Sequence, residues 1–212
     1  MEAFTTHRGR LATLDRANVD TDQIIPKQYL KSIRRTGFGE ALFADWRYGA
    51  DGKPDPDFPL NSKRFQGASI LVARNNFGCG SSREHAVWAV VQYGFRAVVA
   101  PWREAPDGAR IPGFADIFAN NAVKNGLLTV QLAPAEVDAI FAAVDRFPGL
   151  EATVDLAEQR LVLHLDEEEA FHFDVEPRVQ VQLMRGLDDI AMSLEHEAGI
   201  TAFEKQHETF LA

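Results

Sequence analysis

The chain has 212 residues and a formal net charge of −9, with 46% hydrophobic and 25% charged residues. These proportions are those of an ordinary globular protein and exclude wholesale disorder, and the acidic balance argues against nucleic acid as the main partner. The single cysteine, Cys79, excludes an internal disulfide, a four-cysteine zinc site and a thiolate-ligated iron–sulfur cluster held by this chain alone.

The sequence predicts neither a signal peptide nor a membrane-spanning segment. The amino terminus has no uninterrupted apolar run of the kind that signal peptides carry, and nowhere do about 18 apolar residues follow one another. A single cysteine is typical of a reducing compartment. We therefore expect a cytoplasmic protein that does not interact with a membrane.

The first 60 residues predict one strand, two short helical segments and an exposed loop. The strand is expected at residues 8–14, and the acidic and hydroxyl-bearing cluster 19–26 follows it. Helical structure is expected at 27–33, after Pro26, and at 38–46, where apolar residues recur at helical spacing. Residues 48–60 are rich in Gly, Asp and Pro, which predicts an exposed loop.

Residues 68–147 alternate between short apolar runs and helical patterns. This alternation predicts the order β–loop–α–β–α–β–α, and hence an α/β fold with a largely parallel sheet and helices packed against it. The strands are expected at 68–73, 97–100 and 127–132, and the helices at 86–93, 114–125 and 134–147. Residues 103–112 fit either an ordered lid or a surface connector.

The pattern changes after about residue 150. Apolar alternation at 153–156 and 160–165 around a polar turn predicts a hairpin, and 171–175 alternates again. Helices are expected at 179–184, 187–194 and 195–207. We expect a single domain over residues 1–212, with this hairpin and the helices as a C-terminal extension.

The loop 77–86, Phe-Gly-Cys-Gly-Ser-Ser-Arg-Glu-His-Ala, carries the most chemical information. It lies between a strand and a helix, where open α/β sheets bind their ligands. Gly78 and Gly80 allow the backbone to approach a ligand closely. Ser81 and Ser82 offer hydroxyls and amides near a helix N-terminus, and Arg83 offers a planar fork for a carboxylate or phosphate. The pattern predicts an anion site.

Two other interpretations of this loop stay open. Ser81 could be a helix N-cap, with Glu84 completing a capping box, although two glycines, two serines and an arginine in six residues exceed what capping requires. Cys79 and His85 could form a thiolate–imidazole pair, but their spacing does not by itself bring them together. Phosphate-loop, dinucleotide-binding and nucleophile-elbow patterns are not met.

Several segments resemble a known family. Residues 78–86 resemble the serine–arginine loop in the C-terminal swivelling domain of the aconitase superfamily. Similarity to the small subunits of bacterial 3-isopropylmalate dehydratases extends over nearly the whole chain, and is carried by 20–30 (Asp-Thr-Asp-Gln-Ile-Ile-Pro-Lys-Gln-Tyr-Leu), 35–39, 42–47, 75–78 and 186–190.

The resemblance implies a β/β/α swivelling domain and a hydro-lyase that isomerises 2-isopropylmalate to 3-isopropylmalate, through a dehydrated intermediate, in leucine biosynthesis. It also implies a separate large subunit, in a heterodimer or heterotetramer, that holds a [4Fe–4S] cluster whose open iron helps the substrate hydroxyl to leave. The small molecule is a 2-hydroxy dicarboxylate. No metal ligand is expected in this chain.

The resemblance also assigns roles to individual residues. Ser81 matches the superfamily serine that acts as the base, as an alkoxide that amides and a cation must stabilise. Asp22 matches an active-site aspartate, although capping of a turn after Thr21 would explain it equally well. Ser82 would add hydrogen bonds and Arg83 would bind a substrate carboxylate, beside the backbone of Gly80.

Residues 29–36 are interpreted as the specificity loop. Tricarboxylate-specific aconitases carry an arginine in this region, whereas this chain has Tyr29 and Leu30 followed by the apolar Ile33. An isopropyl group suits such a loop better than a third carboxylate does. Homoaconitase, dimethylmalate hydratase and citraconate hydratase small subunits remain alternatives, as does an anion-binding module without catalytic activity.

Overall fold

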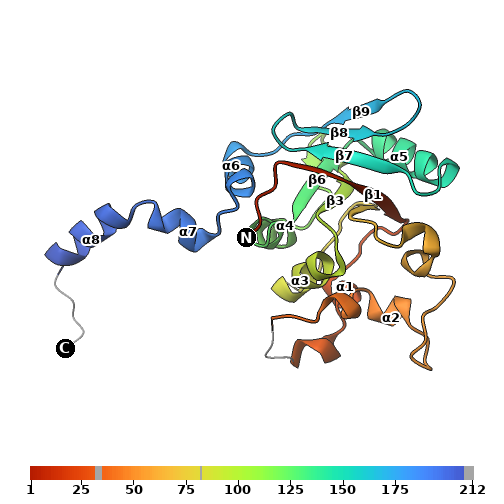
Figure 1. Cartoon of the computed structure of the whole chain (residues 1–212), viewed down its shortest axis with the longest axis horizontal. Coiled ribbons are helices and arrows are strands. Elements are labelled where there is room, and N and C mark those ends of the chain that lie inside the picture. Colours follow the sequence, from red (N-terminus) through yellow and green to blue (C-terminus); the bar gives the residue numbers. More distant parts are fainter. Residues whose placement is uncertain (32–34, 82, 208–212) are drawn as a thin grey trace.

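The computed structural model describes residues 1–31, 35–81 and 83–207. A seven-stranded sheet in the order β6-β3-β2-β1-β7-β8-β9 forms the centre of the molecule (Figure 1). Its strands are β1 (Thr6–Leu14), β2 (Ile70–Ala73), β3 (Ala97–Pro101), β6 (Leu128–Leu132), β7 (Glu151–Asp155), β8 (Arg160–Leu163) and β9 (Glu169–His172).

One half of the sheet is parallel, as the alternation of strands and helices predicts. β1 pairs with β2, β2 with β3 and β3 with β6, all in parallel. Every residue of β2 and β3 is buried, because helices cover both faces of this half. Leu14 pairs with Ala73 at the carboxyl ends of β1 and β2, so the segments that follow these two strands leave from the same edge.

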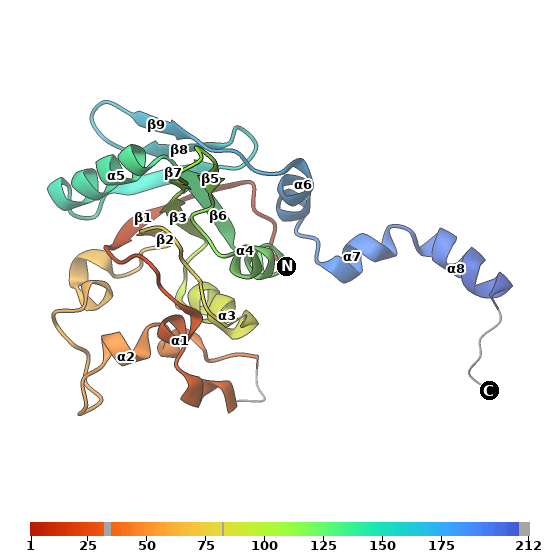
Figure 2. The same ribbon diagram turned by 180° about the vertical axis from the view of Figure 1, so that it is seen from behind.

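The crossover helices lie on opposite sides of the parallel strands. α5 packs against β1, β2 and β3 on one side, whereas α3 and α4 lie together on the other (Figures 1 and 2). α3 ends at Gly94 and α4 at Asn125-Gly126, as expected. Their bounds are α3 (Glu84–Tyr93), α4 (Asp116–Lys124) and α5 (Pro134–Arg146).

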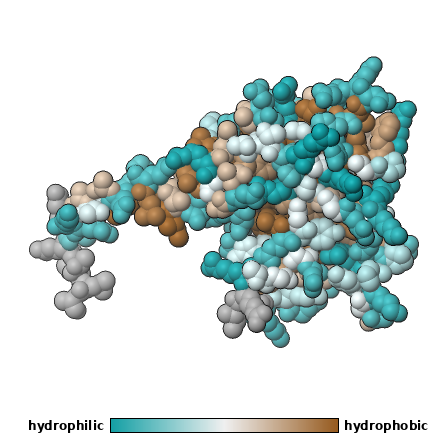
Figure 3. Space-filling model, in the orientation of Figure 1, coloured by the Kyte–Doolittle hydropathy of each residue, from teal (hydrophilic) through white to brown (hydrophobic). Residues whose placement is uncertain are grey.

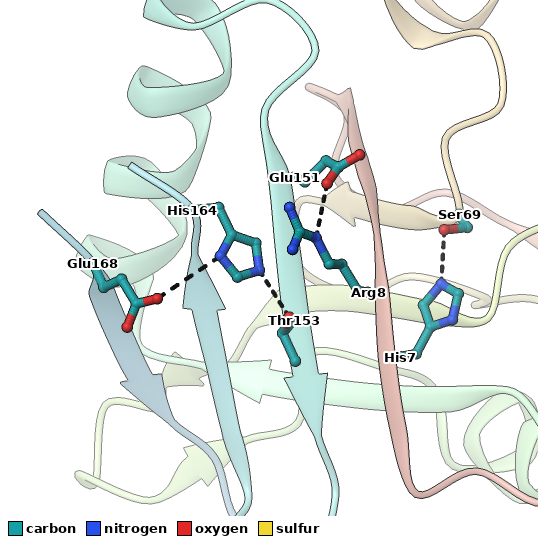
Figure 4. Close-up of polar contacts among 7 residues, drawn as sticks. All are labelled: His7, Arg8, Ser69, Glu151, Thr153, His164 and Glu168. Carbon is teal, nitrogen blue, oxygen red and sulfur yellow. Dashed lines mark hydrogen bonds and ion pairs between the residues drawn. The ribbon is translucent and has the colours of Figure 1, made fainter. Parts of the chain in front are cut away.

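The other half of the sheet is antiparallel. The predicted hairpin, β7 and β8, is confirmed, but it also continues the sheet, because β7 pairs antiparallel with β1. β9 completes the sheet next to β8. The outer face of these strands carries polar contacts (Figure 4), which include Arg8 Nε to Glu151 at 2.9 Å and Thr153 Oγ1 to His164 Nε2 at 2.8 Å. This half is therefore covered on one face only.

Two expectations for the first 60 residues are wrong in part. Residues 38–46 do not form one helix: Phe43 has φ +52° and separates the 3₁₀ turn Gly39–Ala41 from α2 (Ala44–Arg47). The loop 48–60 is not wholly exposed, because Phe58 and Leu60 are buried. The ring of Phe58 packs 6.1 Å from that of Phe43, so core packing overrides the polar pattern of the loop.

Smaller elements complete the chain. α1 (Thr21–Ile24) and a 3₁₀ helix at Lys27–Lys31 follow β1, and the rest of the predicted helix 27–33 lies outside the described residues. Residues 103–112 form a ribbon of β4 (Arg103–Glu104) and β5 (Arg110–Ile111). Two further 3₁₀ turns occupy Pro59–Asn61 and Lys63–Phe65. Among the described helices, none combines the length and the apolar character that crossing a bilayer requires.

The C-terminal helices are α6 (Pro177–Arg185), α7 (Asp189–Leu194) and α8 (Glu197–Gln206), close to the expected positions. α6 is joined to the amino-terminal segment, since Phe4 N donates to Leu183 O at 2.8 Å. Beyond Gly186, α7 and α8 extend away from the body of the molecule (Figure 1).

Candidate active site

The edge at which β1 and β2 end brings two distant segments together. The segment after β1 leads into α1, and the segment after β2 is the glycine–serine loop before α3. Gly78 N donates to Val19 O at 2.7 Å and Thr21 N donates to Cys79 O at 2.9 Å, so the two backbones run side by side. The pairing of two parallel strands thus places α1 against the loop that the sequence singled out.

Asp20 rather than Asp22 caps α1. Its Oδ1 accepts from Gln23 N at 2.8 Å, and the Gln23 side chain accepts from Asp20 N at 2.9 Å, which completes a capping box. The alternative role of Asp22 as a turn cap is therefore wrong. The Asp22 carboxylate instead forms an ion pair with Arg83 and lies 3.4 Å from Lys27 Nζ.

Ser81 is exposed on the loop, and a hydrogen bond from a buried residue fixes its backbone. The hydroxyl of Thr21, a residue that is only 1% exposed, donates to Ser81 O at 2.5 Å. α3 begins at Glu84, with Arg83 as its N-cap residue and no side-chain capping bond. The capping box of Ser81 and Glu84 is therefore wrong, and the Ser81 hydroxyl is not used to start the helix.

Two glycines shape this loop as expected. Gly78 has φ +77° and Gly80 has φ +86°, values that other residues rarely adopt. A Cβ atom on Gly78 would lie 2.5 Å from Cβ of Phe118, so α4 packs directly against the backbone of the loop. Gly80 is exposed, next to Asp20 of the facing segment.

Arg83 is largely covered, with 19% of its side chain exposed, and its ion pair with Asp22 fixes the guanidinium beside the loop. A guanidinium has five N–H donors in one plane. Because one Asp22 oxygen pairs with Arg83, the guanidinium has further N–H groups with which it can bind a second anion. Asp22, Ser81 and Arg83 therefore meet at one edge, although the sequence separates the aspartate from the other two by about sixty residues.

The predicted specificity loop starts next to this edge. Tyr29 is 39% exposed, whereas Leu30 packs against the core. Residues 35–38 lie against α3: Gln92 Oε1 accepts from Phe38 N, and Gln92 Nε2 donates to Arg35 O, both at 2.8 Å. Ile33 and Ser82, both predicted to bind substrate, lie outside the described residues.

Thr21 and Gln92 are positioning residues that sequence reasoning missed. Thr21 lies between two aspartates, and Gln92 lies near the end of α3. Neither a threonine nor a glutamine indicates an active site by its residue type alone. Each acts on residues remote in sequence, Thr21 on Ser81 and Gln92 on Arg35 and Phe38. Only the aspartate–threonine–aspartate cluster at residues 20–22, in the segment that follows the first strand, could have drawn attention to Thr21.

The structure argues against a thiolate–imidazole pair of Cys79 and His85. The His85 ring packs edge-on to Phe38 at 5.4 Å and lies 4.6 Å from Trp88. Burial, and then the nearby charge of Asp20, raise the pKa of the Cys79 thiol above its ordinary value. Cys79 therefore remains a neutral thiol at physiological pH.

We expect Cys79 to react with iodoacetamide more slowly than free cysteine at pH 8. The raised pKa of Cys79 reduces the fraction of thiolate, which is the reactive form. The rate, followed by mass spectrometry, should still rise as the pH passes 9. A rate that reaches its plateau below pH 8 would instead indicate a thiolate activated by a neighbouring base.

Comparisons with known proteins match the whole chain. The aconitase C-terminal domain family matches residues 1–135. A 3-isopropylmalate dehydratase small subunit from Desulforapulum autotrophicum is 57% identical over 211 residues, which cover 100% of this chain and 98% of the relative. Proteins of the same name from Methylibium petroleiphilum and Delftia acidovorans are each 51% identical over 97% of this chain and 94% and 93% of their own lengths.

A solved structure supports the fold. The crystal structure of 3-isopropylmalate dehydratase from Methanocaldococcus jannaschii superposes with a TM-score of 0.63 and 24% identity, over 94% of this chain and 99% of that one. The α/β swivelling fold implied by the sequence resemblance is confirmed. The chain belongs to the aconitase C-terminal domain family and, within it, to the 3-isopropylmalate dehydratase small subunits.

Proposed function

We propose that this chain, together with a separate large subunit, isomerises 2-isopropylmalate to 3-isopropylmalate by removing and re-adding water. The observation that carries the proposal is the meeting of exposed Ser81 with the Asp22–Arg83 ion pair at one edge of the sheet. The names of relatives that match the full chain at 51–57% identity support the choice of substrate.

Arg83 is proposed to bind a substrate carboxylate. Dehydration requires the loss of a proton from the carbon beside a carboxylate, and negative charge then spreads onto that carboxylate. A guanidinium that is already held by Asp22 stabilises this charge without reorganising. Asp22 thereby acts as a positioning residue for Arg83. Lys27 Nζ lies 3.4 Å from Asp22 Oδ2 and so adds a second cation beside the Asp22 carboxylate.

Ser81 is proposed to take this proton at Oγ and to return it in the reverse direction. A serine hydroxyl is a very weak acid, so its alkoxide form needs a cationic and water-excluded surrounding. Arg83 supplies charge two residues further along, and Thr21 holds the loop in place. Since Ser81 is exposed in this chain, the exclusion of water must come from a partner that covers the loop. Ser82 is proposed to add a hydrogen bond.

The residues of this chain do not fit an iron–sulfur cluster. The chain has one cysteine, and within the described ranges there is no group of three or more histidine, cysteine, aspartate or glutamate side chains that could hold a metal. We therefore assign the cluster implied by the family to the large subunit. The chain supplies the base and the carboxylate-binding arginine.

Reconstitution tests this proposal. The purified chain alone is expected to leave 2-isopropylmalate unchanged, and a mixture with the cluster-bearing large subunit from the same organism should yield 3-isopropylmalate, separated by chromatography. Turnover of homocitrate, dimethylmalate or citraconate in place of 2-isopropylmalate would reassign the substrate. A mixture that binds these acids without any turnover would show an anion-binding module.

Exchanging Ile33 for arginine is expected to lower kcat/KM for 2-isopropylmalate by about 10- to 200-fold, because an apolar contact with the isopropyl group is replaced by a charge. Steady-state kinetics of the reconstituted enzyme measures this effect. Ile33→Leu, which keeps an apolar side chain of equal size, should stay close to the wild type. Unchanged kinetics of Ile33→Arg would contradict the assignment of the loop.

A further inference from the structure

The C-terminal arm, defined here as residues 187–206, presents large apolar side chains to solvent. Ile190 and Leu194 on α7 are 71% and 57% exposed, and Ile200 and Phe203 on α8 are 41% and 63% exposed. Each pair is three or four residues apart, so its members lie on one face of their helix. Figure 3 shows apolar atoms gathered along the arm, away from the body. Such faces in soluble proteins mark interaction sites.

α7 is joined to the rest of the molecule near both of its ends, whereas α8 lies beyond these contacts. Lys124 Nζ on α4 lies 2.9 Å from Asp189 Oδ2, and the amino-terminal ammonium of Met1 donates to Gly186 O at 3.1 Å. Arg185, at the end of α6, forms a further ion pair with Glu195, the residue that follows the last turn of α7. These contacts orient α7 before any partner binds, which lowers the entropy lost on binding.

The negative charge of the arm favours a partner surface with basic side chains. It carries five carboxylates against one lysine: Asp188, Asp189, Glu195, Glu197, Glu204 and Lys205. A second copy of this chain has a formal charge of −9 and would bring like charges together. A partner of different sequence, with an apolar groove between basic side chains, meets both the charge and the apolar face.

The arm also lies outside the residues that the family match covers. The aconitase C-terminal domain match ends at residue 135, yet alignments with three proteins named small subunits extend over 97–100% of this chain. The arm therefore accompanies the domain in chains whose names imply a larger partner.

We propose that the arm docks into a basic-rimmed apolar groove on the large subunit and so holds the two chains together. This inference rests on the proposed function, which supplies the large subunit as the partner. The arm makes no contact with substrate. Its role is to bring the exposed loop around Ser81 to the face of the large subunit that completes the site.

The test compares full-length variants in titration calorimetry against the large subunit from the same organism. The double variant Ile190→Asp with Phe203→Asp is expected to raise Kd by about 100-fold, because two large apolar side chains no longer become buried. Glu197→Lys with Glu204→Lys should raise Kd by about 10-fold at low salt and by less at high salt. The control, Phe147→Asp, replaces a side chain that is 40% exposed at the end of α5, and should leave Kd unchanged.

Two results would overturn the proposal that the arm docks on the large subunit. An unchanged Kd in the apolar double variant, with native circular dichroism, would overturn the inference. So would sedimentation data in which the wild-type chain alone self-associates and the double variant does not, because a second copy would then cover the arm.

Activity in the same mixtures separates this inference from the proposed function. At large-subunit concentrations above its Kd, the double variant should recover the full kcat. Arm-dependent binding without conversion of 2-isopropylmalate would refute the proposed function alone, and conversion with an unchanged Kd would refute the arm alone. A wild-type chain that does not bind the large subunit would refute both.

Discussion

Replacing Ser81 by alanine is expected to lower kcat for 2-isopropylmalate by about 10²–10⁴-fold in the reconstituted enzyme, the range that general-base catalysis commonly contributes. The expected loss is in kcat rather than in KM, because Arg83 and its partner Asp22 remain to bind the carboxylate. Stopped assays of product formation at saturating substrate measure this change.

Structural damage would not explain such a loss. The Ser81 side chain is exposed, and the bond that Thr21 makes is to the backbone oxygen of Ser81, which alanine retains. Thermal unfolding of Ser81→Ala should therefore match that of the wild type. Ser62→Ala, at a position whose side chain caps no helix, is the matched control and should keep full activity. Near-normal turnover by Ser81→Ala would assign the proton transfer to another group.

Replacing Gly78 by alanine is expected to destabilise the fold by about 2–5 kcal/mol. Its φ of +77° costs an alanine about 1–2 kcal/mol. The new methyl group would also lie 2.5 Å from Cβ of Phe118, and overpacking of this kind costs about 1–3 kcal/mol. Urea denaturation followed by circular dichroism measures the free energy of unfolding.

Gly149 provides the matched control for this prediction. It has φ +84°, and a Cβ atom there would meet no other atom within 4 Å. Gly149→Ala should therefore show only the conformational cost, about 1–2 kcal/mol. In a Phe118→Ala background, the additional loss from Gly78→Ala should shrink only in part, because alanine removes the ring of Phe118 but keeps the Cβ atom that lies 2.5 Å away. Equal losses at the two glycines in the wild-type background would show that α4 does not constrain the loop.

Local patterns in the sequence predicted most of the elements correctly. The apolar runs of β2, β3 and β6, the helix-ending Gly94 and Asn125-Gly126, and the hairpin of β7 and β8 depend on neighbouring residues only. The glycine–serine–arginine loop was also recognisable, because its residues are contiguous. The failures arose where tertiary packing overrode a local pattern: Phe43 adopts φ +52° within an apolar segment, and Phe58 is buried within a polar loop.

By itself, the sequence determined the class of fold, the acidic charge, the loop that carries Ser81 and Arg83, and the inability of one cysteine to hold a cluster. Only the tertiary structure decided that Asp22 pairs with Arg83 and that Thr21 supports Ser81, because both contacts join segments about sixty residues apart. They depend on β1 lying beside β2 in parallel register. Strands as uniformly apolar as β2 and β3 carry no alternation that specifies a neighbour or a register, so these are set by the packing of the whole core.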